Sequence, residues 1–288
     1  MSIPRRFHFV FGLREQSEAF HLLHYLCLAS CIAVNKPESI QFHYRHEPWG
    51  ELWDRIRPML TMRPIASGPS AFRPERYEDT QEGRMIRNLG IDYAHEADFL
   101  RLDILAEEGG IYADMDTLFV QRYPEAWLDS DFVIGEEYSP LAPGEPMRPS
   151  LCNAVLLSRP ESAFLSAWRQ GMARAFDGRW NTHSCREAGR LWHQMPEAVR
   201  VLPSAYFYRY GSTPEGIRTL LEERDCPPAD LYSVHLWAHL WWSAERRDMT
   251  DVHAGMIDGE WIRKSNSTLA NLARSFLPDG PATDHRAG

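Results

Sequence analysis

Residues 94–120 constrain the fold of this chain more than any other part of its sequence. Apolar residues recur there at helical spacing, and two short apolar runs that favour buried strands follow them. Between helix and strand stand Gly109 and Gly110, and glycine tolerates the left-handed conformation that ends many helices. The pattern predicts a helix, a tight turn, a strand, an acidic turn and a second strand.

Asp114, Met115 and Asp116 form the acidic turn between these strands. In an extended chain residues i and i+2 point the same way, so both carboxylates are expected to aim at one place, with Met115 opposite. Two like charges so close are costly unless a cation lies between them. Hard oxygen ligands suit Mg²⁺ or Mn²⁺, so we expect a divalent metal here. The alternative is an acidic surface turn, because the tripeptide alone is common.

The N-terminal part predicts a β-α-β unit. The apolar run of residues 6–12 suits a strand buried on both faces, as in a parallel sheet. An apolar stripe at helical spacing covers about residues 18–34, and residues 40–44 alternate as a second strand. Such units bind nucleotides, yet neither G-x-G-x-x-G nor a Walker-type loop occurs. A metal at the acidic turn would hold the phosphates instead.

Residues 97–116 resemble the signature of glycosyltransferase family 32, the DXD sugar transferases. That signature has a small residue, Asp, two apolar residues and Arg, then an apolar helix, Gly-Gly-apolar-Tyr and Asp-x-Asp. Asp103 departs from it, since the family more often has an aromatic or neutral residue near that position. Seven positions are filled here as the signature requires: Asp98, Arg101, Gly109, Gly110, Tyr112, Asp114 and Asp116.

The resemblance implies one GT-A-like α/β domain over residues 1–277, a Rossmann-type mixed sheet with helices on both faces. Residues 278–288 are rich in Pro and Gly and are expected to be a disordered tail. The implied reaction moves a sugar from a nucleotide diphosphate sugar to a hydroxyl of a glycan, lipid-linked or protein acceptor. It would be aided by Mn²⁺ or Mg²⁺ and retain the anomeric configuration. Bacterial polysaccharide synthesis is the expected setting.

The same resemblance implies roles for individual residues. Asp114 and Asp116 would hold metal, ribose and diphosphate, with Tyr112 beside the donor. Asp98 and Arg101 would line the donor sugar or its phosphates as catalytic residues, because a guanidinium binds oxyanions bidentately. The opening strand is similar to the family's Ile-Pro-Lys-x-Ile-His-x-x-Trp, which implies nucleotide-base contacts for three residues: Phe9, Phe11 and Gly12.

A second constellation lies at residues 232–242 and looks like the family's late pattern of His, apolar, Trp, two residues, Ser and Trp. His235, Trp237 and Trp241 match it, while Leu240 stands where Ser is usual. A neutral imidazole can complete the coordination of a metal, so His235 is the candidate third ligand. The alternatives are a structural strand histidine, or His239 as the ligand.

Two further segments are read by the same resemblance. Asn153 lies in an apolar run, residues 151–157, where the family places an Asn beside the sugar. It is the third candidate catalytic residue, expected to hydrogen-bond sugar or acceptor, or else to be an ordinary strand-end Asn. The Pro-rich residues 139–150 are either a passive linker or a lid that excludes water. Residues 182–185 replace a Gly-Pro that many members carry, which leaves acceptor contacts there undefined.

Charge and cysteine usage narrow the partners and the compartment. The net charge of −9 argues against nucleic acid or an anionic membrane as partner. Five scattered cysteines include no metal-type CxxC pair and fit a reducing compartment. The sequence shows no signal peptide and no apolar run of transmembrane length. We expect a bacterial-type cytoplasmic enzyme, with a peripheral position on the inner membrane as a variant of this hypothesis.

Three other functions compete with sugar transfer. A haloacid-dehalogenase-type phosphatase also has Asp-x-Asp after an apolar strand, but it needs Thr or Val four residues after the first Asp. Here Thr117 is three after, and Leu118 holds the expected place. A non-catalytic sugar-binding partner is disfavoured by the intact acidic pair. A transferase acting on protein rather than glycan stays open.

Overall fold

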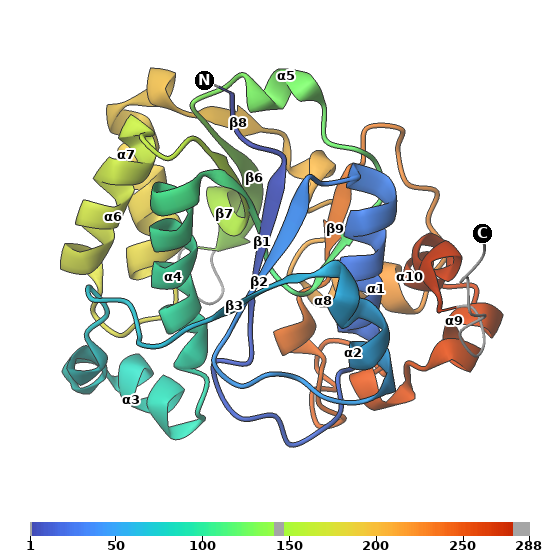
Figure 1. The fold of residues 1–288 in the computed structure, drawn as a ribbon. Helices are drawn as coiled ribbons and strands as arrows, with labels where there is room; N and C mark the ends of the chain where they lie inside the picture. The colour runs from blue at the N-terminus through green and yellow to red at the C-terminus, as the bar shows by residue number, and fades with distance from the viewer. Residues whose placement is uncertain (1, 141–146, 279–288) are drawn as a thin grey trace.

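A seven-stranded mixed sheet forms the centre of the molecule, with helices packed on both of its faces (Figure 1). The structure is a computed structural model and describes residues 2–140 and 147–278. The strand order is β3-β2-β1-β4-β7-β6-β8, in which β3, β2, β1 and β4 run parallel and β7 runs antiparallel to β4 and β6. The expected α/β class with a mixed sheet is therefore confirmed.

The predicted β-α-β unit is present at the start of the chain. β1 (Arg6–Phe11) and β2 (Ser39–Tyr44) pair in parallel, and α1 (Leu22–Ser30) connects them. The helix begins later than predicted, because the His21 imidazole accepts a hydrogen bond from the Leu23 N–H and so caps it. It ends in a π-type turn, and α2 (Glu51–Ile56) leads to β3 (Thr61–Pro64).

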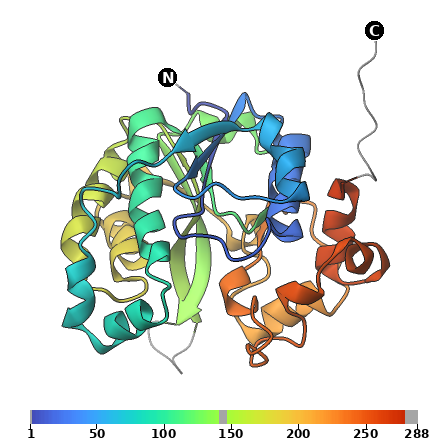
Figure 2. The same ribbon diagram turned by 60° about the horizontal axis from the view of Figure 1, so that its bottom comes forward.

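Each face of the sheet has its own apolar core. On one face α4 (Tyr93–Glu108), α6 (Ala163–Ala175) and α7 (Glu187–Gln194) bury large aromatic and aliphatic side chains, among them Trp168 and Phe164. On the other face α1 and α2 pack with the C-terminal helices, as Figures 1 and 2 show. These are α8 (Pro214–Leu221), α9 (Gly259–Lys264) and α10 (Thr268–Ala273).

The Gly-Gly turn joins α4 to the sheet. Gly109 and Gly110 both have positive φ, at 63° and 109°. A Cβ on Gly110 would lie 2.6 Å from the Arg6 carbonyl oxygen, so only glycine lets β4 (Gly110–Ala113) approach β1 so closely. The turn thereby fixes where β4 begins, and the acidic residues follow directly after that strand.

After β4 the chain leaves the main sheet. β5 (Thr117–Phe119) pairs antiparallel with β9 (Ser233–His235) in a separate two-stranded ribbon, in which Thr117 lies opposite His235. This pairing brings a segment from late in the chain to the acidic turn.

The strands β6 (Phe132–Pro140) and β7 (Met147–Ser158) are longer than their apolar runs predict. They pair antiparallel with a register shift after Ile134, and β8 (Arg200–Leu202) adds to β6. The centre of the Pro-rich segment, residues 141–146, lies outside the described residues, and so does the tail from residue 279. The lid and the disordered tail stay predictions. The two remaining short helices are α3 (Gln81–Asn88) and α5 (Glu125–Leu128).

Within residues 2–140 and 147–278, none of the helices combines the length and the apolar character that crossing a bilayer requires.

Candidate metal centre and donor site

The acidic residues follow β4 at the carboxyl end of the parallel strands. The Asp114 N–H donates to the Ala154 carbonyl at 2.9 Å, and the Thr117 N–H donates back to the Asp114 carbonyl at 3.0 Å. The triplet is therefore a tight turn, and the expected extended conformation is wrong. The two carboxylates nevertheless converge on one place as expected, and the Met115 side chain is buried.

His235 lies directly opposite these carboxylates. Its Nε2 is 3.1 Å from Asp116 Oδ1 and 3.8 Å from Asp114 Oδ2, and one ligand atom from each residue lies within 4.8 Å of the other two. The Asp114 side chain is 25% exposed and the Asp116 side chain 15% exposed, so both reach solvent. Two carboxylates and one imidazole suit Mg²⁺ or Mn²⁺ and leave positions open for phosphate oxygens.

Each aspartate has one oxygen held by the protein and the other facing the centre. Asp114 Oδ1 accepts from the Tyr112 hydroxyl at 2.7 Å, and Asp116 Oδ2 accepts from the Ala238 N–H at 2.8 Å. The remaining oxygens, Asp114 Oδ2 and Asp116 Oδ1, are those nearest His235. The turn is therefore oriented for a ligand before one arrives.

The charges at the centre are unequally stabilised. Burial raises the pKa of Asp114 above its ordinary value, and the charge of Asp116 adds to this effect. Burial opposes ionisation of Asp116 too, but His235 and the Ala238 N–H outweigh it and hold the pKa of Asp116 well below its usual range. Burial disfavours a charged His235, yet attraction to Asp116 and Asp114 raises its pKa above the ordinary value. The two carboxylates therefore favour a positive charge at this place.

Metal affinity should therefore depend on pH. A metal must displace the proton from His235, whose pKa is raised, so Mn²⁺ affinity should fall about tenfold for each unit of acidification below that pKa. Mn²⁺ titration followed by electron paramagnetic resonance, from mildly alkaline to mildly acidic pH, measures this dependence. His235→Gln should weaken binding and flatten the slope. His239→Gln should leave the slope intact, because His239 is exposed and is not among the three residues whose ligand atoms converge. An unchanged slope in His235→Gln would contradict the assignment.

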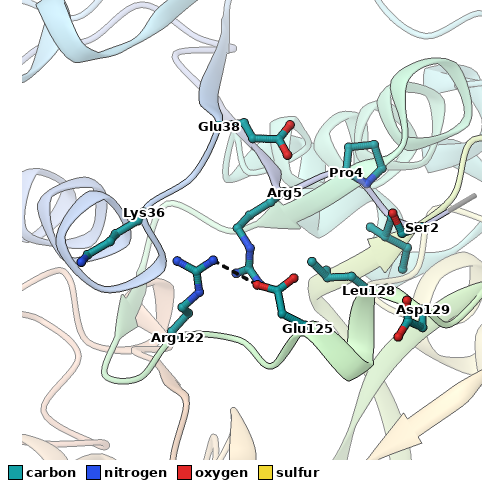
Figure 3. A pocket seen from close by; sticks show the side chains of 10 residues that line it. Ser2, Pro4, Arg5, Lys36, Glu38, Arg122, Glu125, Leu128 and Asp129 are labelled. Carbon is teal, nitrogen blue, oxygen red and sulfur yellow. Dashed lines mark hydrogen bonds and ion pairs between the residues drawn. The ribbon is translucent and has the colours of Figure 1, made fainter.

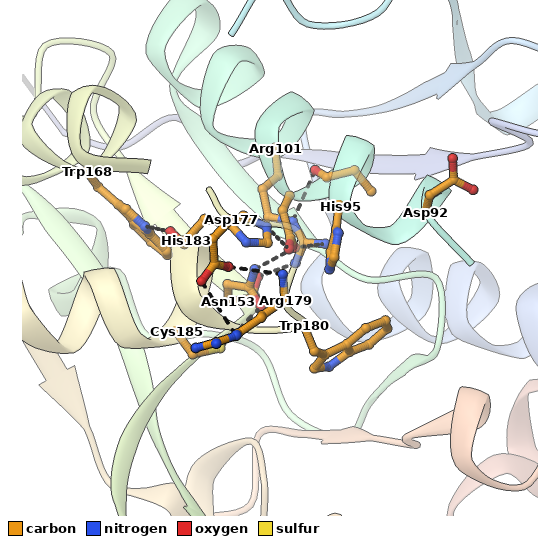
Figure 4. Close-up of polar contacts among 12 residues, drawn as sticks. Asp92, His95, Arg101, Asn153, Trp168, Asp177, Arg179, Trp180, His183 and Cys185 are labelled. Carbon is orange, nitrogen blue, oxygen red and sulfur yellow. Dashed lines mark hydrogen bonds and ion pairs between the residues drawn. The ribbon is translucent and has the colours of Figure 1, made fainter. Parts of the chain in front are cut away.

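Arg101 joins the centre to the predicted donor residues. Its Nη1 donates to the Asn153 carbonyl at 2.8 Å and its Nε to the Ala97 carbonyl at 3.2 Å. Its Nη2 lies 3.0 Å from Asp98 Oδ1 and 3.3 Å from Asp114 Oδ1. This guanidinium, whose side chain is only 5% exposed, offsets the negative charges of both carboxylates. Figure 4 shows Arg101 reaching toward Asn153 from α4.

Asp98 is fully engaged within the protein. Its Oδ1 accepts from the Asn153 amide at 2.7 Å, and its Oδ2 lies 3.0 Å from His183 Nε2. Burial opposes its ionisation, but Arg101 and His183 outweigh burial and lower the pKa of Asp98 to about 2. Asp98, Arg101 and Asn153 thus form one cluster beside the metal centre, and contact of any of them with a sugar stays a prediction.

The residues expected at the nucleotide base lie at the end of β1. The Phe9 side chain is wholly buried against Phe119, and contact of this residue with the base stays a prediction. Phe11 is half-buried and meets His24 edge-on at 4.8 Å, and His24 Nδ1 lies 3.1 Å from the Met115 carbonyl oxygen. Gly12 has a φ of 64°, and a Cβ there would collide with the His46 carbonyl. Phe11 and Gly12 lie at the carboxyl end of β1, which is the edge of the sheet where a donor is expected to bind.

Two buried polar residues of the site were missed by sequence reasoning. His183 is fully buried and packs on Phe99, and Glu137 on β6 is buried beside Cys152 and Cys185. Burial raises the pKa of Glu137. The only available signals were the departure from the family pattern at residues 182–185 and the acidic pair that follows the β6 apolar run.

A hollow at the opposite edge of the sheet is not part of this site (Figure 3). It lies at the amino end of β1, where Arg5, Lys36 and Arg122 face Glu38, Glu125 and Asp129. Glu125 is 2.7 Å from Arg5 and 3.0 Å from Arg122. The three basic and three acidic residues of this hollow balance in charge. The donor is not expected there, because ligands of open α/β sheets bind at the carboxyl ends of the strands.

Comparisons relate this chain to known glycosyltransferases. Residues 33–134 match the family described as "Glycosyltransferase sugar-binding region containing DXD motif". The chain is 28% identical over 292 residues to "Glucan organizing enzyme 1" of Cryptococcus neoformans var. grubii. The aligned region covers 99% of this chain and 73% of that protein. Among solved structures it is similar to the galactosyltransferase LgtC in complex with donor and acceptor sugar analogs, with a TM-score of 0.46 and 16% identity over 96% of this chain and 97% of that one. It is also similar to the PaToxG glycosyltransferase, with a TM-score of 0.46 and 14% identity over 68% of this chain and 71% of that one.

Proposed function

We propose that this chain, a glycosyltransferase of the DXD type, moves a sugar from a nucleotide diphosphate sugar to an acceptor hydroxyl with the help of a divalent cation. Asp114, Asp116 and His235 would hold the cation. The observation that carries this proposal is the convergence of their three ligand atoms at the carboxyl end of β4. In open α/β sheets ligands bind at that edge.

The bound cation would neutralise the diphosphate as it leaves. The protein's own residues prepare the place for it. Tyr112 and the Ala238 N–H orient one oxygen of each aspartate, which leaves the other oxygen for the metal. Arg101 offsets the charge that Asp98 and Asp114 would otherwise leave uncompensated, so the site can be built in a buried place.

The finer features of the reaction belong to the same proposal. We assign Mn²⁺ or Mg²⁺ as the cation, because the donor set holds two carboxylates and one imidazole. We infer retention of the anomeric configuration, with the departing diphosphate taking the proton of the acceptor hydroxyl. No side chain is assigned as nucleophile. The donor sugar would contact the cluster of Asp98, Arg101 and Asn153, with the base near Phe11 and Gly12.

The biological setting is inferred more indirectly. The five cysteines are unpaired, which supports a reducing compartment such as the cytoplasm. Similarity to a fungal protein named for glucan organisation supports a glycan as acceptor or product. Polysaccharide synthesis is therefore the setting that we propose, and the bacterial origin expected from the sequence has no support from this relative.

The competing functions fit less well. A phosphatase of the haloacid-dehalogenase type needs Thr or Val four residues after its first Asp, and here Leu118 stands four residues after Asp114. A non-catalytic sugar binder does not explain a complete ligand set. Transfer of a sugar to protein uses the same donor chemistry and is the second candidate.

A thermal-shift screen tests the donor chemistry. UDP- and GDP-sugars should stabilise the protein only when Mn²⁺ is present, by about 2.7 kcal/mol at a hundredfold excess over the dissociation constant. Asp116→Asn serves as the control and should lose this stabilisation. Stabilisation by a small phosphate ester alone, without nucleotide, would refute the transferase proposal in favour of a phosphatase.

A further inference from the structure

We propose that Trp180 and His239 form an aromatic stacking platform for a neutral pyranose ring of the acceptor, at the border of the metal centre. The inference rests on the proposed function, because it assigns the second substrate of the same site. It names the acceptor as a carbohydrate and gives that carbohydrate a place on the protein.

The first observation is an exposed tryptophan held among other rings. Trp180 is 37% exposed, although a large indole is usually well buried. Its ring centroid lies 5.6 Å from that of His239, with planes inclined by 36°. The centroid of His95 is also 5.6 Å away, and Figure 4 shows His95 beside Trp180. His239 is itself exposed. Two neighbouring aromatic rings thus present surface to solvent.

The second observation is that the platform is held in place. The backbone N–H of Trp180 donates to Glu82 Oε1 at 3.0 Å and anchors the chain at this residue, while the ring itself packs on His95 and His239. His95, behind the indole, lies 2.8 Å from the Tyr77 hydroxyl and packs edge-on against His183 at 4.7 Å. A ring fixed before binding loses little conformational entropy when a ligand arrives.

The third observation links the platform to the metal centre from both sides. His239 lies in a short turn, Ala238–Leu240, whose first N–H holds Asp116 Oδ2 at 2.8 Å. On the other side, His183 packs against His95 and lies 3.0 Å from Asp98 Oδ2. A sugar that stacks here would lie next to the centre where the donor diphosphate is expected.

The charge of the platform indicates a neutral ligand. The indole of Trp180 carries no charge, and an exposed imidazole such as that of His239 is charged only at acidic pH. The nearby Arg179 is 3.8 Å from Asp177, which offsets its charge. An uncharged aromatic surface suits the C–H face of a pyranose, whose hydroxyls would then face neighbouring polar groups or water. A nucleobase stacks on aromatic rings as well, but the β1 edge near Phe11 is its expected place.

Saturation-transfer-difference NMR with neutral di- and trisaccharides of hexopyranoses tests the platform. We expect binding to the wild-type protein, binding weakened about tenfold or more in Trp180→Ala, and binding largely kept in Trp180→Phe. His239→Ala should weaken binding as well and acts from the other side of the platform if Trp180→Ala does not fold. Trp49→Ala is the matched control, because Trp49 is a surface tryptophan that is 53% exposed.

The thermal shift with nucleotide diphosphate sugar and Mn²⁺, measured on the same variants, separates the two proposals. It should not change in Trp180→Ala. No saccharide binding by the wild type, or equal binding by Trp180→Ala, overturns the platform even if the donor binds. Loss of nucleotide stabilisation in Trp180→Ala overturns it too, because the base would then be the occupant. Trp180-dependent saccharide binding without any effect of nucleotide and Mn²⁺ would support the platform and refute the proposed donor.

Discussion

Replacing Asp116 by Asn is expected to reduce sugar transfer at least a hundredfold. Asp116 supplies the carboxylate nearest to His235, at 3.1 Å, and interactions hold its pKa well below its usual range, so it is ionised at neutral pH. Asn has nearly the same shape but lacks the charge that binds a hard cation. Because charge stabilisation by a metal contributes several kcal/mol, its loss costs about two orders of magnitude or more in rate.

The measurement is kcat for sugar transfer, or for donor hydrolysis, together with Mn²⁺ affinity. Asp103→Asn is the matched control, since Asp103 lies on α4 away from the metal centre, is partly exposed and pairs with Arg169 on the surface. That variant should keep both activity and affinity. An Asp116→Asn protein that is fully active at saturating Mn²⁺ would show that the carboxylate is not a metal ligand.

The predictable parts of the fold are those that a pattern of neighbouring residues indicates. The strands β1, β2 and β4 and the helix α4 follow apolar periodicity and glycine placement, and the structure has them close to the expected places. The start of α1 was misplaced because an imidazole caps it, which is not among the usual capping residues. The acidic triplet was expected to be extended, but a backbone hydrogen bond from Thr117 to Asp114 closes a turn there.

The candidate site divides in the same way. Asp114 and Asp116 stand within one short stretch that has a recognisable pattern. His235 is far away in sequence and was placed beside them only through the family resemblance; pairing of β5 with β9 accounts for its position. His183 lies 85 residues after Asp98 in the sequence and meets it only in the folded chain. Glu137 becomes buried through strand pairing. A single buried polar residue forms no repeating pattern in the sequence, so the neighbouring residues do not indicate that it is buried.

Replacing Arg101 by Ala is expected to destabilise the protein by about 3–5 kcal/mol, as removal of one partner from a buried ion pair does. The guanidinium is 5% exposed and is the positive group nearest to both Asp98 and Asp114, at 3.0 and 3.3 Å. Its loss would leave two poorly compensated carboxylates and free the Asn153 carbonyl. Activity should fall with it, since Asp114 would lose its orientation.

The pH dependence of this variant gives an independent check. With Arg101 present the pKa of Asp98 is about 2, so the stability contributed by the ionised carboxylate is complete above its unfolded pKa of about 3.9 and is lost as pH falls through 2. Without Arg101 the pKa of Asp98 should rise. The Arg101→Ala protein should therefore lose its acid resistance at a higher pH than the wild type.

Urea unfolding at neutral and acidic pH measures both effects. Arg101→Lys keeps the charge but cannot direct N–H groups to Ala97, Asn153 and the two carboxylates at once, so it should recover only part of the stability. Arg169→Ala removes an exposed arginine that pairs with Asp103, and surface ion pairs contribute about 1 kcal/mol at most. If Arg101→Ala were no less stable than Arg169→Ala, the buried pairing of Arg101 could not be what holds Asp98 and Asp114 in place, and the role of the whole cluster in positioning the metal ligands would have to be abandoned.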